Sequence, residues 1–487
     1  MLVVVALFYV NVSRAYFCGY DDFNETYWAE FVDARNPAHI LTRTHFISSM
    51  FRPVTSGLQY GTWALFGFDP LAFRLRNLAM HLFSTAAVFG IALLLGRSTW
   101  AATGAALLFG LSPVANEAVA VAIWTNTTAY ALVLWSFFLF AYSLERAQAR
   151  RWFPPLAGSL LLAFLALFTY EPAIVVFGFI YGYGAIRFRR EPLIPRAFLG
   201  VLIGATALEL GAFFGARHLL AITGTDFVSA GVFLHNAAVY GAGLLSPIDS
   251  VLAHAVFGVP LPSTPTSAVA LLWPALLGAV VLLTLAALGL ARPAGPRLRS
   301  VDWPVIAFLV AAIPFSILPI LAFRPHPSEF NLYVPAALYA VALSVVWWKL
   351  SRGPIAYSVV VGFLVVSYAC GTFVRNERVV ACGRIVSHIL AQLPAATWRT
   401  GSWHVRLATP ASEKLATPFG IYNYEGLETI EVPAAKTPGA QEAARIVTGN
   451  DAVTVDVVDP AALSAGCTVP HTCYLVSANG DVKEVHP

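Results

Sequence analysis

Two adjacent carboxylates, Asp21 and Asp22, directly follow the first hydrophobic segment of the chain. Carboxylates at the rim of a membrane are costly to keep ionised in an apolar setting, and they suit proton abstraction or cation binding. We therefore expect this pair to take part in a reaction. The plainer alternative is that Asp22 caps a helix that begins at Phe23 and that both acids are solvated.

The composition predicts the class of protein around this pair. Hydrophobic residues make up 58% of the 487 residues and charged residues only 11%, whereas soluble domains have roughly 25% charged residues. The mean hydropathy of +0.70 agrees with a polytopic membrane protein. The formal net charge of +4 is spread along the chain without a polybasic block, so nucleic acid is excluded as a partner. Arginine far outnumbers lysine, a bias that suggests a GC-rich, bacterial genome.

About eleven apolar runs approach the ~20 residues needed to cross a bilayer. They cover residues 1–17, 77–95, 99–113, 127–144, 154–169, 172–187, 197–216, 268–290, 302–322, 331–348 and 354–373. Basic connections such as Arg97, Arg187 and Lys349 fall on one side, which the positive-inside rule makes cytoplasmic. The first run is short and has no basic lead-in, which indicates a signal-like anchor or, as we favour, a start further upstream.

The opposite, outer side collects the long segment 18–76, the turns 112–126 and 323–330, Tyr170-Glu171 and the segment 217–267. Within 18–76, the stretches Phe23–Val32 and Phe46–Leu65 are typical of amphipathic helices on the membrane surface. Long structured loops often carry function. We therefore expect the site on this outer face.

After residue 375 the sequence becomes mixed and polar, and alternating apolar positions predict strands at 402–408, 452–458 and 472–477. The fold class expected is thus an all-α polytopic membrane protein with a small C-terminal α/β domain. We place the membrane domain at 1–375 and the extracytoplasmic domain at 376–487. Cys467 and Cys473 could form a disulfide there, or could be two free thiols.

Further residues on the outer side could complete a site. Glu117 could share the roles of base and stabiliser with the aspartate pair, or join it in binding Mg²⁺ or Mn²⁺, although Glu117 could also simply favour a helix start. Arginine forks suit phosphate oxygens and could take the place of a metal. The candidates for a donor phosphate are Arg74, Arg76, Arg217 and Arg324, whose alternative role is contact with lipid headgroups. The sequence leaves metal dependence open.

Two polar positions fall inside apolar runs. Glu209 lies about two helical turns before Arg217 and could line a cavity or make a structural hydrogen bond. Asn77 and His81 are four residues apart on one helical face, where they could act as a ligand pair or bond neighbouring helices.

Several short motifs occur in a fixed order along residues 15–375. They are Tyr20-Asp21-Asp22-Phe23, Phe51-Arg52-Pro53-Val54, Asn77-Leu78-Ala79-Met80-His81, Ser112–Ala120 with Asn116 and Glu117, Thr169-Tyr170-Glu171-Pro172-Ala173, and Glu329-Phe330-Asn331-Leu332-Tyr333-Val334-Pro335. This order resembles the membrane half of GT-C glycosyltransferases. It is most similar to the O-mannosyltransferase group whose membrane part precedes tetratricopeptide repeats.

The resemblance implies transfer of a sugar from a polyprenyl-phosphate carrier to a hydroxyl of a glycan, lipid or protein acceptor, on the outer face of the cytoplasmic membrane. It implies that Asp21 or Asp22 is the base and Glu117 the second acid. Single displacement would invert the anomeric centre. Further site candidates are Arg52, His81, Asn116, Glu171, Glu209, His326, Glu329 and Tyr333.

The chain departs from this group in three ways. Ser112 stands where the group usually has histidine, Tyr170 stands in a lysine position, and tetratricopeptide repeats are absent. A carrier or flippase for a lipid-linked saccharide is the alternative function, but such proteins have internal repeats and charges near the bilayer midplane. A membrane-anchored sensor would leave the polar motifs between the spans unexplained.

Overall fold

The computed structural model describes most of the chain. The residues that it does not describe are 18–19, 43–50, 123–124, 148–150, 191–193, 223–226, 247, 249–251, 253–301, 324–328, 352, 409–415, 418–419, 422–438, 459–462, 464–470, 478–480 and 486–487. The predicted span 268–290 and the candidates Arg324 and His326 therefore lie outside the described residues.

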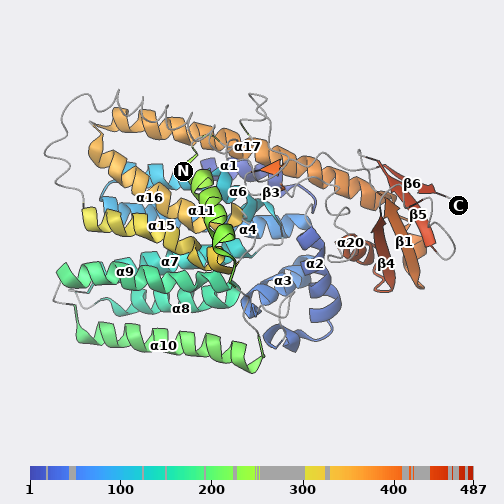
Figure 1. Cartoon of the computed structure of the whole chain (residues 1–487), viewed down its shortest axis with the longest axis horizontal. Coiled ribbons are helices and arrows are strands. Elements are labelled where there is room, and N and C mark those ends of the chain that lie inside the picture. The colour runs from blue at the N-terminus through green and yellow to red at the C-terminus, as the bar shows by residue number, and fades with distance from the viewer. Residues whose placement is uncertain are drawn as a thin grey trace.

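A helical bundle makes up the larger part of the protein, and its long helices lie roughly parallel (Figure 1). Its members are α1 (Leu2–Ser13), α4 (Pro70–Gly96), α5 (Thr99–Gly110), α7 (Asn126–Glu145), α8 (Phe153–Thr169), α9 (Val175–Arg190), α10 (Arg196–Leu219), α11 (Ala230–Leu245), α15 (Trp303–Phe323), α16 (Tyr333–Leu350) and α17 (Pro354–Gln392). Six helices among the described residues are long and apolar enough to cross a membrane, namely α4, α7, α10, α15, α16 with its preceding turn, and α17. The fold class expected from the sequence is confirmed.

Shorter elements gather at one end of this bundle. They are α2 (Tyr20–Tyr27), the π-helical segment η1 (Trp28–Asp33), the 3₁₀ turns η2 (Pro37–Leu41), η3 (Glu171–Ile174) and η4 (Glu329–Leu332), and the helices α3 (Pro53–Phe66) and α6 (Pro113–Ala120). Figure 1 shows α2 and α3 between the bundle and the terminal sheet. Proline begins α3, α4, α6 and α17, because its missing N–H and fixed φ suit the first helical position.

The predicted spans coincide with helices wherever the structure describes them. One expectation is wrong: the segment 217–267, taken from sequence as a connection, contains the apolar helix α11. Among the described residues, the basic connections at Arg97 and Arg187 lie together at one end of the bundle, as expected. There Glu145 pairs with Arg97 at 2.7 Å and with Arg187 at 2.9 Å.

The terminal domain is built on a four-stranded sheet in the order β4-β1-β5-β6. β1 (Trp403–Ala408) lies between two parallel neighbours, β4 (Val453–Val458) and β5 (His471–Val476), and β6 (Val482–Val485) pairs antiparallel with β5. The other elements are α18 (Ala395–Trp398), a small pair β2 (Ala416–Thr417) and β3 (Gly420–Ile421), and α20 (Gly439–Thr448), which leads into β4. The three predicted strands are confirmed, and β6 was missed.

The described cysteines bear on the disulfide expected in this domain. Cys473 is buried and disulfide-bonded, whereas Cys370 and Cys382 are free. Its expected partner, Cys467, lies outside the described residues.

A single helix joins the two parts of the protein. α17 has 39 residues, which at 1.5 Å per residue is about 58 Å, well beyond the ~30 Å of a bilayer core. The predicted domain boundary at residues 375 and 376 falls within it. α17 also packs closely against the backbone that leads into α2. A Cβ atom added at Gly383 would lie only 2.7 Å from the Tyr16 nitrogen and 2.8 Å from the Tyr16 oxygen.

This close approach gives a prediction for two glycines of the same helix. Gly383→Ala should lower the free energy of unfolding by about 1–3 kcal/mol, because the methyl group must push α17 away from the Tyr16 backbone. Gly362→Ala, where nothing lies within 4 Å of the added carbon, should leave stability unchanged or raise it by up to ~1 kcal/mol. Thermal unfolding of the purified protein in detergent measures both. Equal destabilisation by the two substitutions would contradict the packing.

Candidate active site

An ion-pair cluster joins three segments that are far apart in the sequence. Glu171, the first residue of η3, accepts a hydrogen bond of 2.8 Å from Arg52 Nε, and Arg52 Nη2 lies 2.7 Å from the same oxygen. Arg217, in the last turn of α10, places Nη1 3.9 Å from the other oxygen of Glu171. We name these three residues the Arg52–Glu171–Arg217 cluster. The sequence analysis predicted each of them as a site residue but did not predict that they contact one another.

Tyr170 contributes to this cluster through its ring. The Arg52 guanidinium lies 4.7 Å from the ring centroid, a cation–π distance. Arg52 is the residue before α3, so the cation beside Glu171 comes from a different element than the carboxylate.

The charge balance of the cluster sets the protonation of Glu171. Burial raises the pKa of the Glu171 carboxyl, but the attraction of Arg52, its hydrogen bond and the attraction of Arg217 lower it by more, so the pKa lies below its usual value. Oε1 of Glu171, the oxygen facing Arg217, is buried and accepts no hydrogen bond among the described residues. The contact of Glu171 with Arg217 is thus longer than its contact with Arg52.

A second group of contacts ties η4 to its surroundings. Glu117, on α6, accepts a 2.9 Å hydrogen bond from the backbone N–H of Phe330. Glu329 forms a buried, bidentate ion pair with Arg375 of α17, in which Nη2 of Arg375 lies 3.0 Å from Oε1 of Glu329. Asn331 accepts a bond from the Tyr170 hydroxyl at 3.2 Å. The elements that carry Glu117, Tyr170 and Glu329 therefore meet at one end of the bundle, as the sequence predicted.

The aspartate pair lies on α2, beside α3. The helix begins at Tyr20, so the reading in which Asp22 caps a helix starting at Phe23 is wrong, and both acids fall in the first turn, where negative charge is favoured. Asp22 is fully buried, and its backbone oxygen accepts a 2.7 Å bond from Thr26. Asp21 is part of the helix, but its side chain is outside the described set.

Arg74 and Arg76 both make hydrogen bonds to other residues of the protein. Arg74 is buried and donates to the backbone oxygens of Ala15 at 2.8 Å, Tyr16 at 2.6 Å and Ala120. It thereby holds the end of α6 beside the chain that enters α2. Arg76 donates to Gln59 at 2.9 Å and lies 5.4 Å from the ring centroid of Phe73. A phosphate contact by either arginine stays a prediction.

The remaining candidates lie deeper in the bundle. His81 is buried between the hydroxyl of Tyr333, 2.8 Å from Nδ1, and the carbonyl of Gly110, 2.9 Å from Nε2. Because a carbonyl only accepts, Nε2 carries the proton and Nδ1 accepts from Tyr333.

Two other candidates also sit inside the bundle. Asn116 donates to Asn376 of α17 at 2.7 Å. Glu209 is buried on α10, and its Oε2 has no hydrogen-bond partner among the described residues.

Sequence reasoning missed Arg375, the partner of Glu329. The only signal was a charged residue at the end of an apolar run, a pattern that equally indicates contact with lipid headgroups. Within the described part of the chain, no group of three or more His, Cys, Asp or Glu residues is placed to hold a metal ion.

Comparisons with known proteins complete these observations. No protein-family model matches the chain, and no curated protein sequence matches it. Among solved structures, ArnT from Cupriavidus metallidurans bound to undecaprenyl phosphate is 12% identical with a TM-score of 0.46, over 98% of this chain and 92% of that one. An oligosaccharyltransferase from Archaeoglobus fulgidus is 10% identical with a TM-score of 0.48, over 94% of this chain and 62% of that one. Similarity of this degree does not identify a function.

The Arg52–Glu171–Arg217 cluster predicts a pH-dependent effect of one substitution. The lowered pKa of Glu171 means that its ionisation stabilises the wild-type fold above about pH 4.5, and that this contribution is lost as the pH falls through the folded-state pKa. In the Arg52→Gln variant, the burial of Glu171 outweighs the attraction that remains from Arg217. The pKa of Glu171 therefore rises, and the ionised carboxyl destabilises the fold. The variant should lose about 3 kcal/mol of unfolding free energy at pH 7.

The difference from wild type should shrink as the pH falls from 7 to 4, measured by chemical unfolding in detergent at several pH values. Arg97→Gln, which removes an exposed partner of Glu145, is the matched control and should cost at most ~1 kcal/mol. A gap that stays constant or widens toward low pH would contradict the charge balance.

Proposed function

We propose that this protein is an integral-membrane glycosyltransferase that moves a sugar from a polyprenyl-phosphate carrier to an acceptor hydroxyl. The observation that carries the proposal is the meeting of charged outer turns at one end of an apolar bundle, next to the helix that bears Asp21 and Asp22. A lipid-phosphate donor needs cations at headgroup level beside an acid that can take a proton. That end of the bundle offers both.

The Arg52–Glu171–Arg217 cluster is the phosphate site in this proposal. Arginine recognises phosphate oxygens through paired N–H donors. Arg52 is bound closely to Glu171, whereas Arg217 lies at the longer distance of 3.9 Å. In this proposal Glu171 keeps the two guanidinium groups near one another before the donor phosphate binds.

The reaction is a single displacement. The acceptor oxygen bonds to the anomeric carbon, the bond from that carbon to the phosphate oxygen breaks, and the phosphate leaves with the electron pair. The proton of the acceptor hydroxyl passes to an aspartate. The arginines stabilise the charge that grows on the leaving phosphate, and the anomeric configuration inverts.

The two aspartates have different parts in this scheme. Because the Asp22 side chain is fully buried, we assign the base to Asp21 and a supporting role to Asp22. Glu117 fixes η4 through Phe330 in this scheme.

The site faces the outside of the cytoplasmic membrane in this proposal. The basic connections at the opposite end, including Arg97, Arg187 and Arg190, favour a cytoplasmic location for that end. The disulfide at Cys473 fits an oxidising compartment for the terminal domain. Since the motif order is most similar to the O-mannosyltransferase group, mannose is the first sugar to test.

Aspartate substitutions test the assignment of the base. In proteoliposomes supplied with decaprenyl-phosphate-linked mannose and an envelope extract from a strain lacking the protein, Asp21→Asn should reduce sugar transfer roughly 10²-fold or more. Asp22→Asn should have the smaller effect. Transfer is measured by mass spectrometry of the extract.

The matched control is Asp69→Asn, which alters an exposed acid of the same outer segment. Asp69 caps α4 through a 2.9 Å bond to Leu71, and asparagine caps equally well, so transfer should be unchanged. Near-parental transfer by both Asp21→Asn and Asp22→Asn would show that neither is the base.

A further inference from the structure

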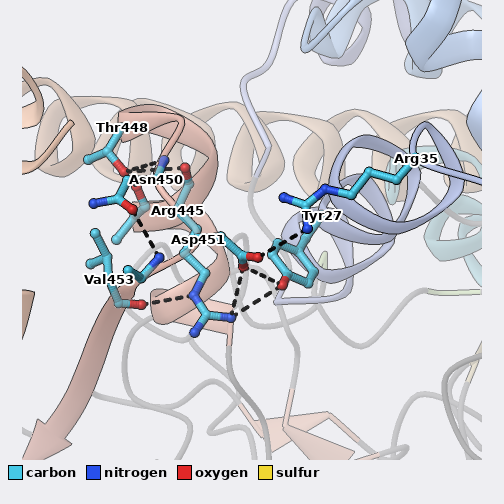
Figure 2. A network of polar contacts seen from close by, with 9 residues as sticks. Tyr27, Arg35, Arg445, Thr448, Asn450, Asp451 and Val453 are labelled. Atoms are coloured by element: carbon cyan, nitrogen blue, oxygen red, sulfur yellow. Dashed lines mark hydrogen bonds and ion pairs between the residues drawn. The ribbon is translucent and has the colours of Figure 1, made fainter. Parts of the chain in front are cut away.

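The helix that carries the aspartates rests on the terminal domain. α2 packs against α20 of that domain, although more than 400 residues separate them. Figure 2 shows the polar contacts at this junction, where Tyr27 points from the end of α2 toward Arg445 and Asp451. Neither the sequence motifs nor the proposed chemistry assigns a role to these three residues.

Three interactions converge on Tyr27. Its hydroxyl donates to Oδ1 of Asp451 at 2.7 Å and accepts from Nη1 of Arg445 at 3.4 Å. The Arg445 guanidinium also lies 5.5 Å from the centroid of the Tyr27 ring. We name Tyr27, Arg445 and Asp451 the Tyr27 latch. A hydroxyl that donates to a carboxylate and accepts from a guanidinium has both of its hydrogen-bonding roles filled.

The domain side of the latch is held in place by the sheet. Arg445 Nε donates to the carbonyl of Val453 at 2.8 Å, where β4 begins. The turn that carries Asp451 is fixed by Asn450, whose side chain accepts from Ala452 N at 3.0 Å and donates to the carbonyl of Trp398 at 2.7 Å. Arg445 and Asp451 thus meet Tyr27 from fixed positions.

α2, which belongs to the membrane part of the protein, depends on this contact with the terminal domain. α2 continues directly into η1, so the helical segment runs from Tyr20 to Asp33, and an isolated helix of about that length is only marginally stable in water. Tyr27 follows Asp22 by five residues, so a displacement of the end of α2 also displaces the aspartates. The start of this segment is held by α17, through the contact between Gly383 and Tyr16. α17 and the terminal domain therefore hold the segment at both ends.

We propose that the terminal domain is a positioning domain for α2, and that the Tyr27 latch fixes the aspartates relative to the Arg52–Glu171–Arg217 cluster. The catalytic consequence rests on the proposed function. Tyr27, Arg445 and Asp451 are positioning residues in this account and do not touch the substrate.

Two readouts on the full-length protein test the proposal. Tyr27→Phe removes the hydroxyl and keeps the ring, and Asp451→Ala removes its acceptor. Hydrogen exchange of the α2 peptide should rise about tenfold in both variants, with little change in the bundle. Mannose transfer from decaprenyl-phosphate-linked mannose should show kcat about tenfold lower and an unchanged KM for the donor, because the cluster is left intact.

The control is Asp481→Asn in the same domain. Asp481 bonds His388 of α17 at 3.0 Å in an exposed pair away from the Tyr27 latch, so this variant should alter neither readout. Unchanged exchange in α2 of Tyr27→Phe and Asp451→Ala would overturn the proposal, as would exchange that rises over the whole protein. A rise in α2 with kcat unchanged would also overturn it.

The experiment separates this inference from the proposed function. If the wild-type protein transfers no sugar, the proposed function fails. In that case, the rate of hydrogen exchange in the α2 peptide of the variants alone tests whether the Tyr27 latch holds the helix.

Discussion

Buried charged side chains at the end of the bundle near α2 must be paired, and that requirement fixes the arrangement of the turns there. A buried charge without a partner costs several kcal/mol. Glu329 and Arg375 are both almost fully buried, and they meet where α6 packs against both η4 and α17. In the same way Glu171 is tolerated because Arg52 approaches from a segment 119 residues earlier. Each pair joins a short turn to another element, so these buried charges also hold this end of the bundle together.

The helices were predictable because the membrane imposes a simple pattern on the sequence. Runs of about 20 apolar residues, ended by arginine or begun by proline, gave the spans of the bundle closely. The strands of the terminal domain were equally visible, since alternation over six residues marks β1, β4 and β5. β6 was missed because it is short and carries the exposed charges Lys483 and Glu484, which suit a sheet edge but hide the apolar alternation.

Partners across the sequence could not be predicted in the same way. Arg217 was recognised as a residue suited to phosphate, and Arg52 and Glu171 were recognised only as further site candidates, but a local pattern does not say which arginine meets which carboxylate. Arg375 was missed for this reason. The burial of Asp22 was also hidden, because it depends on how α2 packs against distant elements. Tyr27 gave no signal at all, since its partners lie more than 400 residues later.

The central claim is that the charged end of the bundle binds a lipid phosphate. Native mass spectrometry of the purified protein, incubated with decaprenyl phosphate, tests this most directly. We expect the wild type to retain one molecule of the lipid, Arg217→Gln to bind it at least about tenfold more weakly, and Arg97→Gln at the opposite end to bind it as the wild type does. Equal retention by all three proteins would contradict the account.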